Sequence, residues 1–295
     1  MDLAQETNVV LSGLTQGALY SIVAIGFNVT YATTGVLNFA QGETLMLGAV
    51  LGAYFATALG WSLLPALAAT LLIVGAVGAL EELLAVRPAS RLGQGVRGWL
   101  LSTLGVAILI RSIVSVTVGQ NLRRFPDIFS RVPTTVGGVR IVPQQVFVIL
   151  LAVAVFVALL LLYERTLLGR SLEAVHQDRE AAAFRGLPIG FLSTASFALG
   201  AMICALGGFA AAPLTGAAPS VGFPFALKGF IAATIGGMGK IQGGMVGGLA
   251  LGVIEALAGQ HIGADYRNVA VFVVLLLVLV ARPQGLLGHE SVREV

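Results

Sequence analysis

The chain has 295 residues, of which 57% are hydrophobic and only 11% are charged, and its mean hydropathy is +0.94. Soluble domains carry about 25% charged residues, so this composition excludes a soluble protein and indicates an integral membrane protein. The net charge of +3 and the dispersed arginines argue against nucleic-acid binding. The one cysteine, Cys204, excludes an internal disulfide. Because no linker-like segment divides the chain, we expect residues 1–295 to form a single transmembrane domain.

Apolar runs follow one another along most of the chain. A helix that crosses the bilayer needs about 20 residues, and most of the runs are long enough. Run 226–239 is short and rich in glycine, which fits either a short tilted span or a re-entrant element covered by protein. We therefore predict an all-α polytopic membrane bundle with eight or nine transmembrane segments, one of them short or re-entrant. The runs are 9–32, 42–60, 61–85, 98–118, 144–163, 191–212, 226–239, 241–260 and 264–281.

The longest charged stretch, YERTLLGRSLEAVHQDREAAAFRGLPI at residues 163–189, predicts one short helix outside the membrane. Gly186 and Pro188 are expected to end this helix, since glycine favours a C-terminal cap and proline cannot continue the backbone bonding. The charge pattern alone leaves open a solvated loop helix without a partner. The apolar members are expected to share one side of the helix; they are Leu172, Val175, Ala182 and Phe184.

Basic residues predict the orientation. If this charged stretch faces the cytoplasm, alternate crossings place ten of the 17 lysines and arginines on the same side. Five lie on the opposite side, four of them in the loop 119–143. The positive-inside rule then favours an external N-terminus and a cytoplasmic C-terminus. In that external loop, Gly137 and Gly138 separate two β-branched runs and predict a small hairpin. The cytoplasmic set is Arg87, Arg91, Arg97, Arg165, Arg170, Arg179, Arg185, Lys240, Arg282 and Arg293.

Glycines recur every four residues in the segment 225–257. Gly244, Gly248 and Gly252 would lie on one face of a helix, and small residues at this spacing let helices approach closely in lipid. We expect these three glycines to pack helices together.

Polar residues stand at the head of an apolar helix in the segment 33–54. Ionisable groups at membrane depth are costly and usually face a bundle interior or a water-filled path. Asn38, Gln41 and Glu43 are therefore candidate pathway residues. Glu255 and Lys228 are candidates for a pathway or a structural pair, and a position at the membrane interface is the alternative for each.

No pattern in the chain predicts catalysis. The segment TIGGMGKI ends like a phosphate-binding loop, but Thr234 replaces its first glycine and Ile241 replaces the serine or threonine that would hold Mg²⁺. The histidines have no metal-ligand spacing with Cys204, and no serine lies in a nucleophile elbow. We therefore expect no catalytic residue, no metal and no cofactor.

Four segments resemble the LivH-type permeases of bacterial branched-chain amino acid ABC importers. They keep the order and the approximate spacing of that family, and the resemblance extends from about Leu11 to Gly288. The segments are GVLNFAQGE at 35–43, EAAAFRG at 180–186, TIGGMGKIQGGMVGG at 234–248 and VARPQGLLG at 280–288.

The resemblance implies a permease subunit of the bacterial inner membrane that carries branched-chain or related amino acids by alternating access. It implies a second, LivM-like permease, two cytoplasmic ATPase subunits and a periplasmic amino-acid-binding protein as partners. It also implies that the segment 164–190 is the coupling loop or helix that docks on an ATPase, so Glu180→Lys should uncouple ATP hydrolysis from uptake. The candidate ATPase-coupling residues are Glu173, Asp178, Glu180, Ala181, Ala182 and Gly186.

Two departures from the family pattern leave the cargo open. Gln41 stands where many relatives carry histidine, and Lys240 with Gln242 replaces a common serine and proline. The cargo could be a branched-chain amino acid, another amino acid or a urea-like amide, and the permease dimer could be mixed or homomeric. A stand-alone secondary transporter or channel would also explain the apolar runs and Glu43, but it leaves the charged helix without a role.

Overall fold

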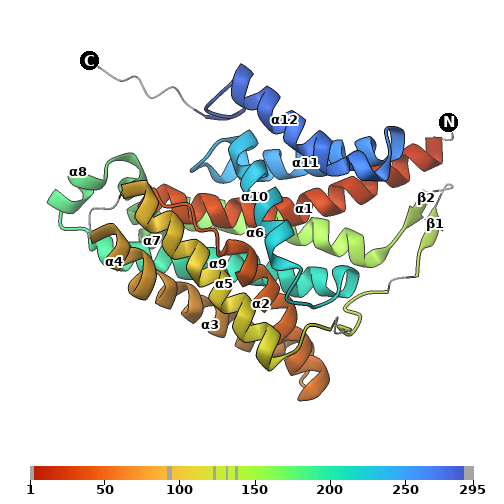
Figure 1. The fold of residues 1–295 in the computed structure, drawn as a ribbon, viewed down its shortest axis with the longest axis horizontal. Helices are drawn as coiled ribbons and strands as arrows, with labels where there is room; N and C mark the ends of the chain where they lie inside the picture. Colours follow the sequence, from red (N-terminus) through yellow and green to blue (C-terminus); the bar gives the residue numbers. More distant parts are fainter. Residues whose placement is uncertain (1–2, 92–94, 122–123, 131, 137–138, 289–295) are drawn as a thin grey trace.

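The computed structural model describes residues 3–91, 95–121, 124–130, 132–136 and 139–288 as a helical bundle with one small hairpin (Figure 1). Within these ranges, seven helices are long and apolar enough to cross a membrane, and the helix α10 (Gly222–Gly236) is apolar but shorter. The prediction of an all-α polytopic membrane bundle is confirmed. The seven spans lie on α1 (Leu3–Thr34), α3 (Leu63–Glu81) with its helical continuation to Ser90, α5 (Gly95–Thr117), α6 (Pro143–Arg165), α9 (Ile189–Thr215), α11 (Ile241–His261), and α12 (Arg267–Ala281) together with the turn Ala264–Tyr266 that precedes it.

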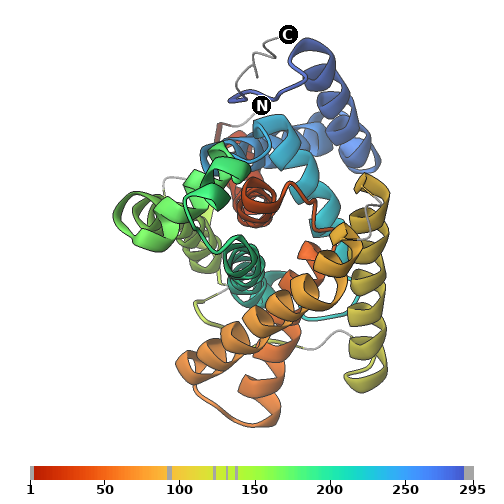
Figure 2. The same cartoon turned by 90° about the vertical axis from the view of Figure 1, so that its left-hand side faces the viewer.

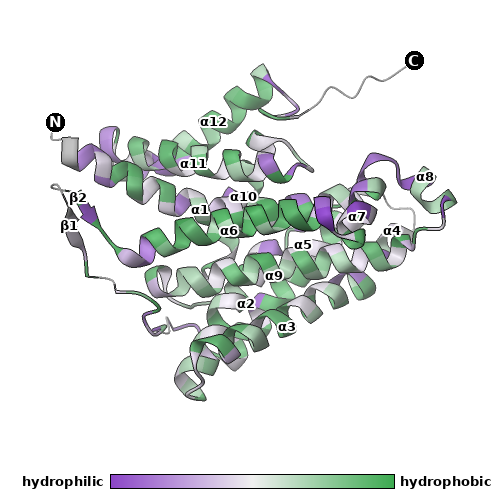
Figure 3. Ribbon diagram, turned by 180° about the vertical axis from the view of Figure 1, so that it is seen from behind, coloured by the Kyte–Doolittle hydropathy of each residue, from purple (hydrophilic) through white to green (hydrophobic). Residues whose placement is uncertain are grey.

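The bundle has two distinct ends. At one end, which we call the hairpin end, β1 (Thr134–Val136) pairs antiparallel with β2 (Val139–Ile141). The backbone N–H of Arg140 donates to Asn8 Oδ1 at 2.8 Å, which fixes the hairpin beside the start of α1. The predicted hairpin is confirmed, although the two glycines expected at its turn lie outside the described residues. Figure 3 shows the long helices as mostly hydrophobic between the hairpin end and the opposite end.

The opposite end, which we call the α8 end, carries two short helices instead of the single helix predicted. They are α7 (Leu167–Gln177) and α8 (Arg179–Phe184). The prediction was wrong because Asp178 adopts an extended conformation, with φ of −154°, and caps α8. Its Oδ1 accepts a hydrogen bond from the Ala181 N–H at 2.9 Å. A short acidic side chain competes in this way with the helical backbone, and so interrupts a helix that apolar periodicity alone would continue.

Phe184 also departs from its predicted position. Leu172, Val175 and Ala182 are buried against Leu192 of α9, as a shared apolar side requires. Phe184 instead is 90% exposed, because the break at Asp178 turns α8 relative to α7.

Two helices begin inside the bundle and not at one of its ends. These are α10 and α2 (Gln41–Ala53), which continues as a π-helical turn over Tyr54–Ala58. Their first turns meet: a Cβ atom built on Gly42 would lie 2.5 Å from Cβ of Ala226 and would overlap the Gly222 carbonyl oxygen. Residues 35–40 lead from the α8 end to α2, and residues 216–221 lead from the hairpin end to α10. Each helix is thus half of a broken crossing.

This connectivity shows how the short run 226–239 contributes to the bundle. The helix α10 starts near the Gly42 contact and ends at Gly236, and Gly239 beyond it lies against the His176 ring of α7. Since α9 ends at the hairpin end and α11 starts at the α8 end, residues 216–239 connect the two ends.

The helix α1 lies at the centre of the bundle and packs on α6, α9, α10 and α11 (Figure 2). Its contact with α11 is close because glycines face it. A Cβ atom on Gly248 or Gly252 would overlap the backbone of Ser21 or Gly17, and one on Gly244 would lie 3.0 Å from the Ile25 nitrogen. Only a residue without a side chain fits where two helix backbones approach this closely.

Candidate coupling surface and membrane-centre site

The surface formed by α7 and α8, which we call the coupling surface, is firmly attached to the bundle. The apolar cluster of Leu172, Val175, Ala182 and Leu192 joins it to α9. Two polar contacts join it to the end of α1: His176 Nδ1 lies 3.0 Å from the Ala32 carbonyl oxygen, and an Arg179 N–H donates to the Thr33 carbonyl oxygen at 3.3 Å. A displacement of this surface would therefore be transmitted to both helices.

The candidate coupling residues occupy different positions on this surface. Asp178, Glu180 and Gly186 are exposed, whereas Glu173 and Ala181 are half-buried and Ala182 is buried. The Ala182 methyl group therefore holds α8 against α9 and does not face outward. Gly186 has φ of +83°, a left-handed conformation that favours glycine and ends α8.

The exposed ring of Phe184 was not recognised from the sequence as a surface feature. The signal available was the single phenylalanine in the charged stretch 163–189, but apolar periodicity assigned it to the buried side. Its exposure next to Glu180 gives the coupling surface an apolar anchor beside an acidic group.

A second site, which we call the membrane-centre site, lies where the first turns of α2 and α10 meet. Glu43 in α2 is almost fully buried and forms an ion pair with Arg111 of α5. Its Oε2 lies 2.7 Å from the position of a Cβ atom on Gly222, the first residue of α10. The free N–H groups and the dipole at a helix N-terminus favour a negative charge there. Glu43 thus links α2 to α5 and lies beside the first residue of α10.

The other two candidate pathway residues belong to a buried network beside this ion pair. Asn38 donates from Nδ2 to Gln41 Oε1 at 3.2 Å and to Glu81 Oε2 at 2.9 Å. The Gln41 amide in turn donates to Cys204 Sγ at 3.3 Å. The structure therefore brings Asn38, Gln41 and Glu43 to one region, although none of them is exposed.

Sequence reasoning missed Glu81 and Arg111 as members of this region. Glu81 stands next to Glu82 in an apolar run, but only Glu82 pairs with Arg87, at 2.8 Å. Arg111 is a single charge within the run 98–118. A charge inside an apolar run was the available signal, and it identifies the residue without identifying its partner.

Arg111 also indicates what covers the neighbouring surface. Its side chain is 38% exposed, and its guanidinium lies over the Phe223 ring at 5.5 Å. A charged group on a membrane helix is costly in lipid and usually faces protein or water. The face around Arg111 and Phe223 is therefore suited to another protein or to a water-filled path.

Lys228 and Glu255, which the sequence left as a pathway or a structural pair, are paired with each other. Lys228 Nζ forms an ion pair with Glu255 Oε1 and donates to Tyr20 Oη at 3.2 Å. Tyr20 Oη donates to Glu255 Oε2 at 2.9 Å. The trio links α1, α10 and α11 on the side of the bundle towards the hairpin end.

A family model described as the branched-chain amino acid transport system permease component matches residues 9–281. The chain belongs to this family. Family members are non-catalytic, multi-pass membrane components of ABC transport systems, and this chain is one of them. The earlier resemblance to LivH-type permeases is thereby confirmed.

Curated relatives cover nearly the whole permease. The high-affinity branched-chain amino acid transport system permease protein LivH of Escherichia coli (strain K12) is 30% identical over 298 residues, with 96% of each chain covered. The corresponding protein BraD of Pseudomonas aeruginosa is 31% identical over 302 residues, with 97% of this chain and 96% of BraD covered. The ribose import permease protein RbsC of Escherichia coli (strain K12) is 25% identical over 281 residues, with 90% of this chain and 83% of RbsC covered.

Proposed function

We propose that this permease carries branched-chain amino acids inward as part of an ABC importer whose α8 end faces the cytoplasm. The observation that carries the proposal is the coupling surface. It presents the exposed Glu180 and Phe184 on α8, and α7 and α8 together are attached to α1 and α9. An exposed aromatic ring beside an acidic group on a platform held in this way fits a protein interface, where aromatic side chains are enriched.

An ATPase subunit docked on α7 and α8 would act on the membrane-centre site through packed helices. The coupling surface is joined to α9 by the Leu172 cluster. The helix α9 in turn packs closely on α2, where a Cβ atom on Gly48 would overlap the backbone of Ala205. A movement of the docked surface would thus shift α9 against α2 and open or close the contact between α2 and α10. This provides a physical route for alternating access.

The partly exposed Arg111 supports a second permease subunit as the partner within the membrane. Its guanidinium would face a protein or the water-filled path between two subunits, and not lipid acyl chains. We propose that a LivM-like permease covers this face, that two ATPase subunits drive the pair, and that a periplasmic binding protein delivers the cargo at the hairpin end. The sequence similarity to LivH and BraD, which extends over nearly the whole chain, supports branched-chain amino acids as that cargo.

We expect Phe184→Ala to weaken the association with the ATPase subunit at least tenfold, because truncating a buried aromatic anchor costs about 2 kcal/mol or more at an interface. The measurement is co-purification of the ATPase with the tagged permease from membranes. Phe191→Ala is the matched control, since Phe191 is also an exposed phenylalanine but lies on α9, outside the coupling surface. Equal ATPase recovery with the two variants would contradict docking on α8.

A further inference from the structure

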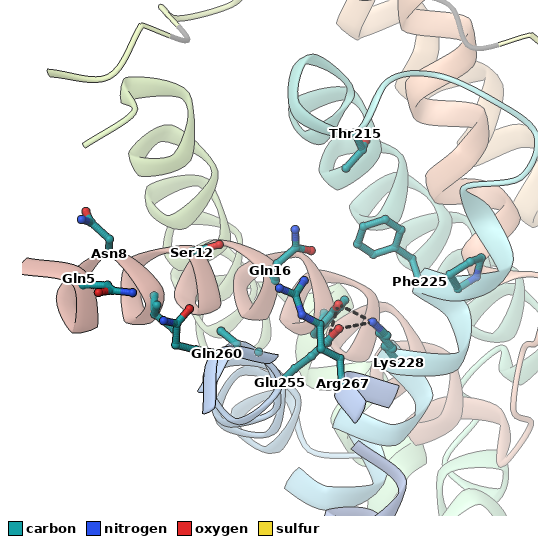
Figure 4. A pocket seen from close by; sticks show the side chains of 15 residues that line it. Gln5, Asn8, Ser12, Gln16, Thr215, Phe225, Lys228, Glu255, Gln260 and Arg267 are labelled. Atoms are coloured by element: carbon teal, nitrogen blue, oxygen red, sulfur yellow. Dashed lines mark hydrogen bonds and ion pairs between the residues drawn. The ribbon is translucent and has the colours of Figure 1, made fainter. Parts of the chain in front are cut away.

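A cavity of about 510 Å³ lies at the hairpin end, between α1, α10, α11 and the start of α12 (Figure 4). Its size falls within the range of small-molecule sites, about 300–1,000 Å³. It is separate from the coupling surface and shares no lining residue with the buried network around Asn38.

The helix α1 presents a polar stripe to this cavity, although the chain as a whole is strongly apolar. The stripe residues are spaced three or four apart and all line the cavity, so they occupy one face of the helix. Polar side chains on a membrane helix favour water or a polar ligand over lipid. The stripe consists of Gln5, Asn8, Ser12, Gln16 and Tyr20.

The cavity contains charges of both signs. Glu255 and Lys228 form the ion pair that Tyr20 bridges, and Arg267 brings a further positive charge from the start of α12. Among the described residues, the side chain of Arg267 makes no hydrogen bond or ion pair, and Figure 4 shows it directed toward Glu255 and Gln16. The cavity therefore has an excess of one positive charge beside a carboxylate.

Gly259 holds Arg267 in this position. A Cβ atom on Gly259 would overlap Arg267 Nε and would lie 2.9 Å from its Cγ. The arginine stem thus lies across the glycine of α11, and a side chain at residue 259 would force this stem to shift.

We propose that this cavity binds a small zwitterion, an α-amino acid, before it reaches the membrane-centre site. The carboxylate of the ligand binds the free guanidinium of Arg267, and its ammonium group faces Glu255 and the amide of Gln16. Pro224 and Phe225 provide an apolar wall for the side chain of the ligand. The assignment rests on the proposed import function, because it places the cargo on the side from which import begins.

The test uses the purified full-length permease in lipid nanodiscs and measures the binding of tritiated leucine. We expect Arg267→Gln to weaken binding at least tenfold and Arg267→Lys to restore part of it, because lysine keeps the charge. Arg140→Gln removes an exposed arginine at the same end, outside the cavity, and should bind leucine like the unaltered protein.

We expect 4-methylpentanoate, which lacks the ammonium group, and 3-methylbutylamine, which lacks the carboxylate, each to compete at least tenfold more weakly than leucine. Unchanged melting temperatures would show that each variant is folded.

Three outcomes would overturn the assignment. They are unchanged leucine binding in Arg267→Gln, equal competition by either singly charged analogue, and a phospholipid at this site that leucine fails to displace, as detected by native mass spectrometry. The test also distinguishes this proposal from the proposed import function. ATP-driven uptake together with leucine binding that is insensitive to Arg267 would refute only the binding site in the cavity. Leucine binding in the cavity without any ATPase association would refute only the ATP-driven import.

Discussion

Gly248→Ala should destabilise the folded permease by on the order of 3 kcal/mol, because the added methyl group would force α1 and α11 apart. A Cβ atom at this residue would overlap the backbone nitrogen and Cα of Ser21, and backbone atoms cannot move aside as the end of a side chain can. Gly17 and Ile25 on the same face of α1 would lose contact as well, since they meet Gly252 and Gly244. The measurement is the unfolding free energy in detergent micelles.

Gly105→Ala is the matched control for this prediction. Gly105 lies in α5, another membrane helix, and a Cβ atom there would meet nothing within 4 Å. Alanine favours a helix over glycine by about 1 kcal/mol, so this variant should be as stable as the unaltered protein or slightly more stable. If both variants had the same stability, the close packing of α1 on α11 would not be the source of the effect.

Arg111→Met should destabilise the permease by about 3–5 kcal/mol, because it leaves the buried carboxylate of Glu43 without its cation. The Glu43 side chain is only 2% exposed, and its Oε2 makes no hydrogen bond among the described residues. Replacing both partners together, as Glu43→Gln with Arg111→Met, should restore most of the stability, since removal of a whole buried ion pair is often nearly neutral. Uptake should remain low in the double variant, because the contact between α2, α5 and α10 has lost its charged link.

The double-mutant cycle for stability separates the ion pair from simple loss of side-chain packing. Glu6→Gln serves as a control, because it removes one partner of the exposed Glu6–His261 pair, where the charged atoms lie 3.3 Å apart. Exposed ion pairs contribute about 0–1 kcal/mol to the free energy of unfolding, so Glu6→Gln should change the stability only slightly. A double variant as unstable as Arg111→Met alone would show that Glu43 is not stabilised by Arg111.

The sequence was sufficient for features that depend on local composition. Runs of apolar residues predicted the membrane helices, and β-branched residues around Gly137 and Gly138 predicted the hairpin. The recurrence of Gly244, Gly248 and Gly252 identified one helical face before the partner helix was known. Each of these patterns repeats within one segment, so no knowledge of distant contacts was needed.

Features that depend on contacts between distant segments could not be predicted in this way. Asp178 can lie on a helix surface or cap a new helix, and only the packing of α8 on α9 distinguishes the two. Glu43 was recognised as a costly charge, but its partner Arg111 lies 68 residues away. The meeting of α2 and α10 likewise joins segments that no local pattern relates, which is why the network around Glu81 was missed.

The proposed function depends most directly on import that is driven by ATP through the coupling surface. The decisive measurement is leucine uptake into proteoliposomes that hold the permease with its partner permease, the ATPase subunits and the binding protein. We expect uptake to require ATP, the ATPase subunits and the binding protein, and Glu180→Lys to preserve ATP hydrolysis while abolishing uptake. Leucine flux through the permease alone, without ATP or any ATPase, would contradict the account and favour a stand-alone secondary transporter or channel.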